Sequence, residues 1–150
     1  MPLNCFTVDF EDWYQGIELP YADWHKYEKR IETGFYAIMD LLNKHKTKAT
    51  FFTLGWVAET YPQLIKELAA AGHELGSHGY SHEKVYNQSK DDFRQEVRKT
   101  KTIIEDISGQ KVITHRSPFF SVTNKSLWAL DILAEEGYTI DCSISPVKTW

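Results

Sequence analysis

The sequence is poor in several features that would assign it to a class at once. Its 150 residues include two cysteines, Cys5 and Cys142, and no Cys-x-x-Cys pair, so we expect two buried free thiols, with a disulfide as the alternative. No apolar run approaches about 18 residues, which predicts no membrane-spanning helix. The net charge of −4 leaves no basic excess, which argues against nucleic acid or an anionic membrane as a partner.

The N-terminal residues also lack the basic and apolar segments of a secretory signal peptide. We therefore expect a cytoplasmic protein, with residues 1–150 forming one domain or part of one. Aromatic residues, in contrast, make up 14% of the chain. Most should lie in the core, and exposed aromatic rings would suit stacking on a sugar ring. The oligomeric state cannot be predicted.

Hydrophobic periodicity predicts strands that alternate with helices. The expected strands are residues 3–10, 49–54, 73–77, 112–116 and 138–143. The expected helices are residues 26–45, 61–71, 89–107 and 123–136. This alternation is typical of right-handed strand–helix–strand crossovers and a mostly parallel sheet, which makes the protein α/β.

Polar residues gather where the predicted strands end, which is where ligands bind in parallel α/β folds. The residues concerned are Asp9 and Glu11 after the first strand, His78 and His82 after the third, Arg116 after the fourth, and Asp141 and Ser143 after the fifth. The last two residues are as compatible with an ordinary strand end as with a functional role. The remaining histidines are expected to lie at the surface or in the core.

Two of these histidines, His78 and His82, stand four residues apart within Gly76–His82. At that spacing two imidazoles lie on one side of a helical turn, close enough to bind one metal ion. A carboxylate would complete a three-ligand site for a divalent ion such as Zn²⁺. Strand alternation favours Glu11 as this ligand, and Asp12 is the alternative if the strand ends early.

The other polar residues suggest a hydrolytic site around this ion. Asp9 would stay free of the metal as a general base, and Arg116 would hold it ionised and oriented. Backbone amides near Phe119 would form an oxyanion hole. Tyr80 would line the substrate groove.

Four motifs resemble those of the polysaccharide deacetylases of the NodB-homology class, carbohydrate esterase family 4. They are Thr7-Val8-Asp9-Phe10-Glu11-Asp12-Trp13, Gly76-Ser77-His78-Gly79-Tyr80-Ser81-His82, Arg116-Ser117-Pro118-Phe119 and Asp141-Cys142-Ser143. The subgroup is similar to the peptidoglycan deacetylases and allantoinase-like proteins. The resemblance implies a distorted (β/α) barrel and hydrolysis of N-acetyl groups from an acetamido sugar of a polysaccharide or peptidoglycan. It also implies a divalent metal, foremost Zn²⁺ with Co²⁺ or Ni²⁺ as alternatives.

The resemblance assigns Asp9 as base, His78 and His82 as metal ligands, and Arg116 as the tether of the base. The chain departs from the family pattern because Phe10 separates Asp9 from Glu11 and because Phe119 replaces a tyrosine. A late histidine that serves as general acid would follow Trp150, so we expect the domain to be truncated at its C-terminus, with strands of the barrel missing. Two alternatives remain: a hydrolase of non-sugar C–N bonds and a non-catalytic carbohydrate-binding relative.

Overall fold

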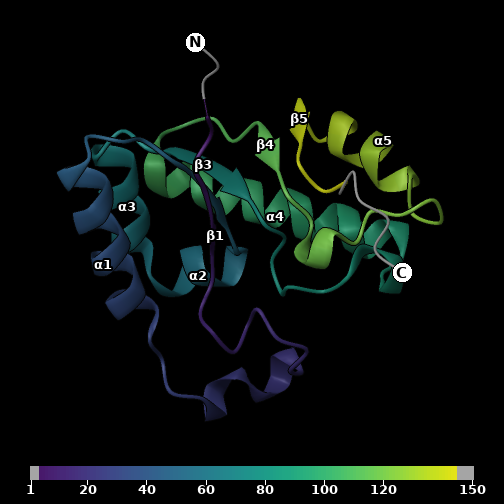
Figure 1. The fold of residues 1–150 in the computed structure, drawn as a ribbon. Coiled ribbons are helices and arrows are strands. Elements are labelled where there is room, and N and C mark those ends of the chain that lie inside the picture. The colour runs from purple at the N-terminus through teal and green to yellow at the C-terminus, as the bar shows by residue number, and fades with distance from the viewer. Residues whose placement is uncertain (1–3, 145–150) are drawn as a thin grey trace.

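A parallel sheet forms the centre of the protein. The computed structural model describes residues 4–144. The strands pair in chain order, β1-β2-β3-β4-β5, and every pair is parallel (Figure 1). Their bounds are Thr7–Phe10 for β1, Thr50–Thr53 for β2, Glu74–Ser77 for β3, Thr114–His115 for β4 and Ile140–Asp141 for β5. The predicted parallel α/β arrangement is therefore confirmed, with strands shorter than expected.

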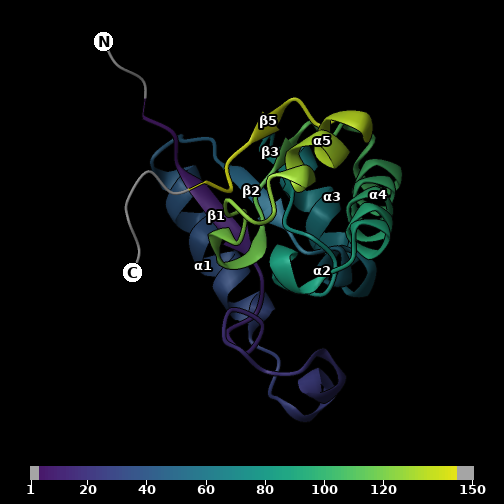
Figure 2. The same cartoon turned by 90° about the vertical axis from the view of Figure 1, so that its right-hand side faces the viewer.

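Helices connect these strands. They are α1 Ile31–Lys44, α2 Gly55–Thr60, α3 Pro62–Ala70, α4 Lys90–Ser108 and α5 Trp128–Glu135, with short 3-10 helices η1 Tyr21–Lys26, η2 Val85–Asn87 and η3 Pro118–Phe120. Figure 2 shows α2, α3, α4 and α5 together on one side of the sheet. The sequence did not predict α2, because six residues are too few to show a helical period. None of the helices between residues 4 and 144 has the length and apolar character that spanning a bilayer requires.

Local sequence signals explain the ends of the longest helix, α4. The hydroxyl of Ser89 accepts a hydrogen bond from the backbone N–H of Asp92 at 3.1 Å, which is the N-cap expected from the sequence. Gly109 ends the helix in the left-handed conformation, with φ of 69°. By contrast, α5 begins at Trp128 and not at the predicted Thr123 or Asn124, because the hydroxyl of Ser126 accepts from the backbone N–H of Thr123 and holds a turn there.

Strand alternation works as predicted along β1. Phe10 points into the core, where its ring centroid lies 5.7 Å from that of Phe35 and 6.0 Å from that of Phe51. Asp9 takes the opposite face and meets Arg116. The prediction for the cysteines is half correct: both are free thiols, but Cys5 is exposed and Cys142 is only half-buried.

The segment after β1 projects beyond the carboxyl ends of the strands. Both views show this segment, which carries η1, below the sheet (Figures 1 and 2). It is anchored by Trp24, which is buried and packs edge-on against Trp56 at the start of α2. The segment therefore stands beside the rim at which ligands are expected.

Candidate metal centre

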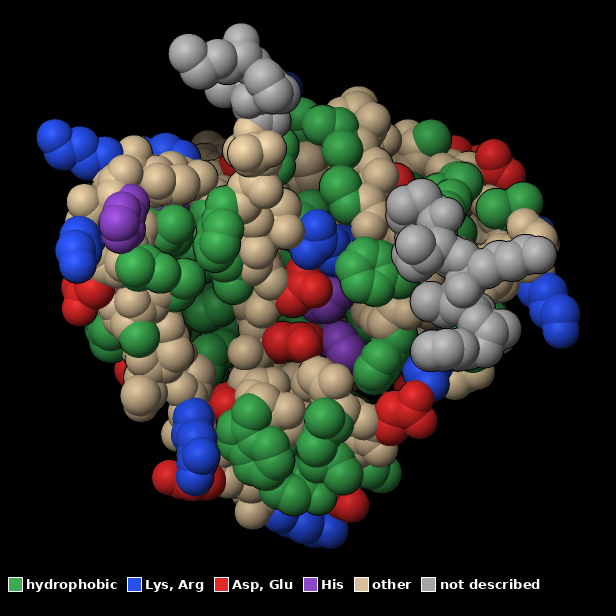
Figure 3. Space-filling view, in the orientation of Figure 1, with side chains coloured by type: hydrophobic (Ala, Val, Ile, Leu, Met, Phe, Trp, Pro, Cys, Tyr) green, Lys and Arg blue, Asp and Glu red, His purple; other side chains and the backbone are tan. Residues whose placement is uncertain are grey.

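Three predicted site residues meet at the carboxyl edge of the sheet. Ligand atoms of Glu11, His78 and His82 all lie within 4.8 Å of one another. The Oε2 atom of Glu11 is 2.9 Å from Nε2 of His82 and 3.8 Å from Nε2 of His78. Figure 3 shows acidic and histidine side chains together in a hollow at the middle of this face. Two imidazoles and one carboxylate form a donor set suited to a divalent cation.

His78 is oriented by the backbone of the residue that follows the neighbouring strand, β4. It directly follows β3, and its Nδ1 donates to the carbonyl oxygen of Arg116 at 2.6 Å, which leaves Nε2 turned toward Glu11. Such a hydrogen bond fixes the tautomer and the ring plane of a metal-binding histidine. Burial lowers the pKa of His78, and the carboxylates of Asp9 and Glu11 only partly oppose that effect. The imidazole is therefore neutral at pH 7 and available as a ligand.

His82 reaches the site from an irregular loop. The motif lies in a loop after the third strand, as expected, but the helical turn suggested by the histidine spacing is absent: residues 78–84 contain no helix, and Gly79 and His82 have φ of 74° and 57°. Gly79 adopts this left-handed conformation freely, but a histidine does so at some cost. The two imidazole centroids nevertheless lie 5.1 Å apart. The loop path, and not helical periodicity, brings the two rings together.

An unpaired carboxylate oxygen shows that these residues fit a cation. Oε2 of Glu11 is buried and has no hydrogen-bond partner among the described residues, although it lies between two imidazole nitrogens. A buried carboxylate oxygen without a partner is costly, and a divalent cation at this position would neutralise it. The observed donor set therefore fits a divalent metal ion.

Asp12, the alternative ligand, lies elsewhere and serves a structural purpose. Its Oδ2 accepts hydrogen bonds from the backbone N–H groups of Arg30 and Ile31 at 2.8 and 3.1 Å. Its Oδ1 accepts from the N–H of Trp13 at 2.8 Å. Asp12 thus satisfies the free amides at the start of α1, where a negative charge is also favoured by the helix dipole. The structure places it outside the three-residue cluster.

Asp9 and Arg116 form a second polar unit beside the cluster. Nη1 of Arg116 donates to Oδ1 of Asp9 at 2.7 Å, and Nη2 donates to the hydroxyl of Thr7 at 3.1 Å. The guanidinium also lies over the ring of Phe52, 4.1 Å from its centroid. These contacts fix Asp9 outside the three-residue cluster.

The two remaining predicted residues differ in position. Phe119 lies at the site: its ring is 4.6 Å from that of His82, and its backbone has φ of 55°. Such strain in a bulky residue is typical of functional segments. Tyr80 points away, with its hydroxyl bonded to Glu59 and its ring under the ammonium of Lys99 at 3.5 Å. The prediction that Tyr80 lines the groove is therefore wrong.

A chain of buried hydrogen bonds supports the strands under the site. The hydroxyl of Ser143 donates to Asp141 at 2.5 Å and accepts from the backbone N–H of Ser117 at 2.7 Å. His115 is fully buried between the hydroxyls of Ser77 and Ser117, at 3.3 and 3.2 Å. Burial lowers the pKa of His115 to about 3, so its imidazole is neutral. It is a core residue, as expected, and Asp141 and Ser143 serve this support.

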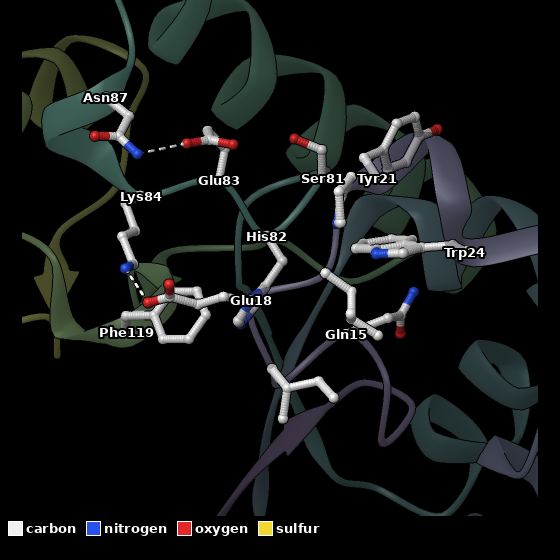
Figure 4. Close-up of a pocket in the computed structure, with 13 residues that line it drawn as sticks. Gln15, Glu18, Tyr21, Trp24, Ser81, His82, Glu83, Lys84, Asn87 and Phe119 are labelled. Carbon is white, nitrogen blue, oxygen red and sulfur yellow. Dashed lines mark hydrogen bonds and ion pairs between the residues drawn. The ribbon is translucent and has the colours of Figure 1, made fainter. Parts of the chain in front are cut away.

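A cavity of about 260 Å³ opens next to His82 and Phe119. Figure 4 shows Lys84 paired with Glu18 across one side of it, and the ammonium lies 4.9 Å from the centroid of the Phe119 ring. Its other wall comes from the projecting segment, including Gln15, Tyr21 and Trp24. These residues were not predicted as site residues, although the abundance of aromatic residues in that loop was a signal.

Comparisons with known proteins give a consistent result. A family model described as Polysaccharide deacetylase matches residues 20–140. A peptidoglycan-N-acetylglucosamine deacetylase from Bacillus cereus is 36% identical over 95 residues, which are 63% of this chain and 34% of that protein. A crystal structure from Mycobacterium smegmatis, 23% identical, has a TM-score of 0.76 and covers 91% of this chain and 49% of that one.

A further solved structure is that of a mutant of a CE4 family pseudoenzyme from Bacillus anthracis with restored enzymatic activity. It is 29% identical, with a TM-score of 0.66, and the match covers 71% of this chain and 38% of that one. The chain thus spans less than half the length of each of these three proteins. The likeness confirms the predicted fold class, to which residues 4–144 contribute five parallel strands.

Proposed function

Because this chain belongs to the polysaccharide deacetylase family, we propose that it forms the metal-binding part of a deacetylase that hydrolyses N-acetyl groups of an amino sugar. Peptidoglycan or another acetamido polysaccharide is the proposed substrate, as in the Bacillus cereus relative. One observation carries the proposal: the Glu11, His78 and His82 cluster lies beside the Asp9–Arg116 pair on a single rim.

Glu11, His78 and His82 would hold the divalent metal. Bound there, the ion would supply Lewis acidity toward the acetamide carbonyl and the attacking water. Imidazole and carboxylate ligands in a three-residue set favour Zn²⁺, and Co²⁺ and Ni²⁺ are compatible with the same donors. Neutral His78 needs no deprotonation before binding, because burial already holds its pKa low.

Asp9 is the proposed general base. Its carboxylate would take the proton of the attacking water, and the 2.7 Å hydrogen bond from Arg116 would keep it ionised and directed toward the rim. The backbone amide of Phe119 is the proposed donor to the developing oxyanion. Tyr80 has no part in this proposal, because its hydroxyl is bonded to Glu59.

The sugar is proposed to occupy the cavity beside His82. The cavity combines hydrogen-bonding side chains, such as Gln15 and Asn87, with the aromatic face of Tyr21. Sugar rings present both hydroxyl groups and an apolar face, so this mixture suits them. An acetamido group at the metal would leave the rest of its sugar next to these residues.

The test is acetate release from N-acetylglucosamine oligomers by purified full-length protein loaded with Zn²⁺. We expect release to require the metal and to fall at least about 100-fold in Asp9→Asn, since general base catalysis contributes about 10²–10⁴-fold. Tyr80→Phe, which keeps the ring, should retain full activity. Equal acetate release by the wild type and Asp9→Asn would refute the deacetylase proposal.

A non-catalytic role is the second candidate, and the likeness to a CE4 family pseudoenzyme favours including it. In that case the cavity would still bind an acetamido sugar, but turnover would be absent. The two functions differ in one pair of measurements. Saturable binding of N-acetylglucosamine oligomers without metal-dependent acetate release would support the binding protein over the enzyme.

A further inference from the structure

The loop that carries His82 has its backbone polar groups bound on one side by α2. The backbone N–H of Gly55 donates to the carbonyl of Gly79 at 2.9 Å, and that of Trp56 donates to the carbonyl of Tyr80 at 3.3 Å. Gly55 also lets the loop approach closely, since a Cβ there would lie 2.5 Å from the Tyr80 ring. The first turn of α2 therefore holds the carbonyl groups of this loop.

On its other side, the loop faces Glu96 of α4. Its Oε1 accepts a hydrogen bond from the hydroxyl of Ser81, the residue before His82. Burial raises the pKa of Glu96, while hydrogen bonds from Ser81 and from the backbone of Tyr80 and Ser81 act in the opposite direction. The hydroxyl of Ser81 therefore binds the carboxylate, and the nearby backbone amides of Tyr80 and Ser81 favour its ionised form.

The carboxylate of Glu96 has no cationic partner within residues 4–144. Glu96 is half-buried, and no lysine or arginine among the described residues forms an ion pair with it. A partly buried carboxylate without a cationic partner depends on hydrogen bonds to compensate for its lost hydration. The contact with Glu96 orders the loop, in which the backbone of His82 adopts a strained left-handed conformation with φ of 57°.

We propose that Glu96 is a positioning residue: by holding the Tyr80–Ser81 backbone it places His82 for metal binding. It touches neither the proposed ligand atoms nor the cavity, and acts through the loop between them. The inference rests on the proposed metal centre. It deepens that proposal, since it adds a residue of α4 that the ligand set does not contain. Mutation of residues that orient metal ligands without touching the metal typically changes metal affinity by 10–100-fold.

Glu96→Gln tests the inference because it preserves shape and removes the charge that attracts the loop amides. We expect the dissociation constant for Zn²⁺ alone, measured by competition with a chromophoric chelator, to rise about tenfold. Ser81→Ala should weaken binding in the same direction. Glu59→Gln is the matched control, since Glu59 also accepts a bond from this loop but only from the exposed side of Tyr80. It should change affinity less than twofold.

Amide hydrogen exchange in the metal-free protein separates this inference from the metal proposal. Protection of the Tyr80 and Ser81 amides should fall in Glu96→Gln and stay unchanged in Glu59→Gln, while exchange in helix α1 remains the same. Unchanged protection in Glu96→Gln, or in Ser81→Ala if the first variant does not fold, would overturn the positioning role. A wild-type protein that shows this protection but does not bind Zn²⁺ would overturn the proposed metal centre alone.

Discussion

At the scale of single residues, the adjacent acids Glu11 and Asp12 have different roles. Glu11 turns toward His78 and His82, and its buried Oε2 lacks a hydrogen-bond partner among the described residues. Asp12 turns the other way and accepts hydrogen bonds from the first amides of α1. Side chains that are adjacent in an extended segment point to opposite sides, and here Glu11 and Asp12 have different partners. The metal cluster and the helix cap are therefore separate functions.

Substitution of the two acids should separate these functions. Glu11→Gln is expected to raise the dissociation constant for Zn²⁺ by at least tenfold, because it removes the anionic ligand. Asp12→Asn should leave that constant nearly unchanged and lower the free energy of unfolding by about 1 kcal/mol, as loss of a charged helix cap does. Calorimetric titration and urea unfolding check both. Loss of Zn²⁺ affinity in Asp12→Asn would contradict the assignment.

At the scale of elements, a chain of short polar side chains ties β3, β4 and β5 together. His115 on β4 lies between Ser77 of β3 and Ser117, and Ser117 is bound in turn to Ser143 after β5. Each hydroxyl can donate and accept, so the chain satisfies buried polar groups without a charge. Burial lowers the pKa of His115 to about 3, so the imidazole in this chain is neutral.

Acid should therefore destabilise this part of the sheet. His115 has an unfolded pKa near 6.5 and a lower folded value, so its contribution is complete above pH 6.5 and declines as the pH falls toward 3. The slope approaches about 1.4 kcal/mol per pH unit for one site. His115→Gln should be less stable at pH 7 but show a shallower decline below pH 6.5, measured by urea unfolding at each pH.

Comparing the wild type with His115→Gln isolates the contribution of one histidine to the pH dependence. His73 and His78, whose pKa values are also lowered by burial, remain in both proteins and contribute equally. His45→Gln, at the exposed end of α1, is the control and should keep the wild-type pH profile. Identical slopes for the wild type and His115→Gln would show that His115 does not carry the effect.

At the scale of the whole molecule, the parallel sheet places the ends of all its strands on one rim. Ligands from the segments that follow β1 and β3 meet there, and Asp9 pairs with Arg116 across 107 residues of sequence. A metal ion bound at this rim links segments that are far apart in the chain. Because such a site does not exist in the unfolded chain, its binding energy adds to folding stability.

Zn²⁺ should consequently raise the melting temperature. At a free concentration 100 times the dissociation constant, the added stability is about 2.7 kcal/mol, which corresponds to roughly 5–10 °C for a domain of this size. A strong chelator should reverse the rise. His78→Ala should abolish it, and His25→Ala, a substitution in η1, should retain it. An equal rise in His78→Ala would place the Zn²⁺ elsewhere.

The sequence alone determined the features that depend on local order. Periods of two and 3.6 residues gave the parallel α/β class, and strand alternation separated Asp9 and Glu11 from Asp12. The N-cap Ser89 and the terminating Gly109 of α4 could also be predicted, because both act within one helical turn. These interactions join residues close in the chain, so their pattern is visible in the order of amino acids.

Only the tertiary structure decided how the site is built. The path of the loop from His78 to His82, the turn of Tyr80 toward Glu59 and the support from Glu96 depend on where α2 and α4 pack. The spacing of two histidines resembled a helical turn, but hydrogen bonds to other elements outweighed that local preference. Contacts between distant segments fix a loop, and a linear pattern does not record them.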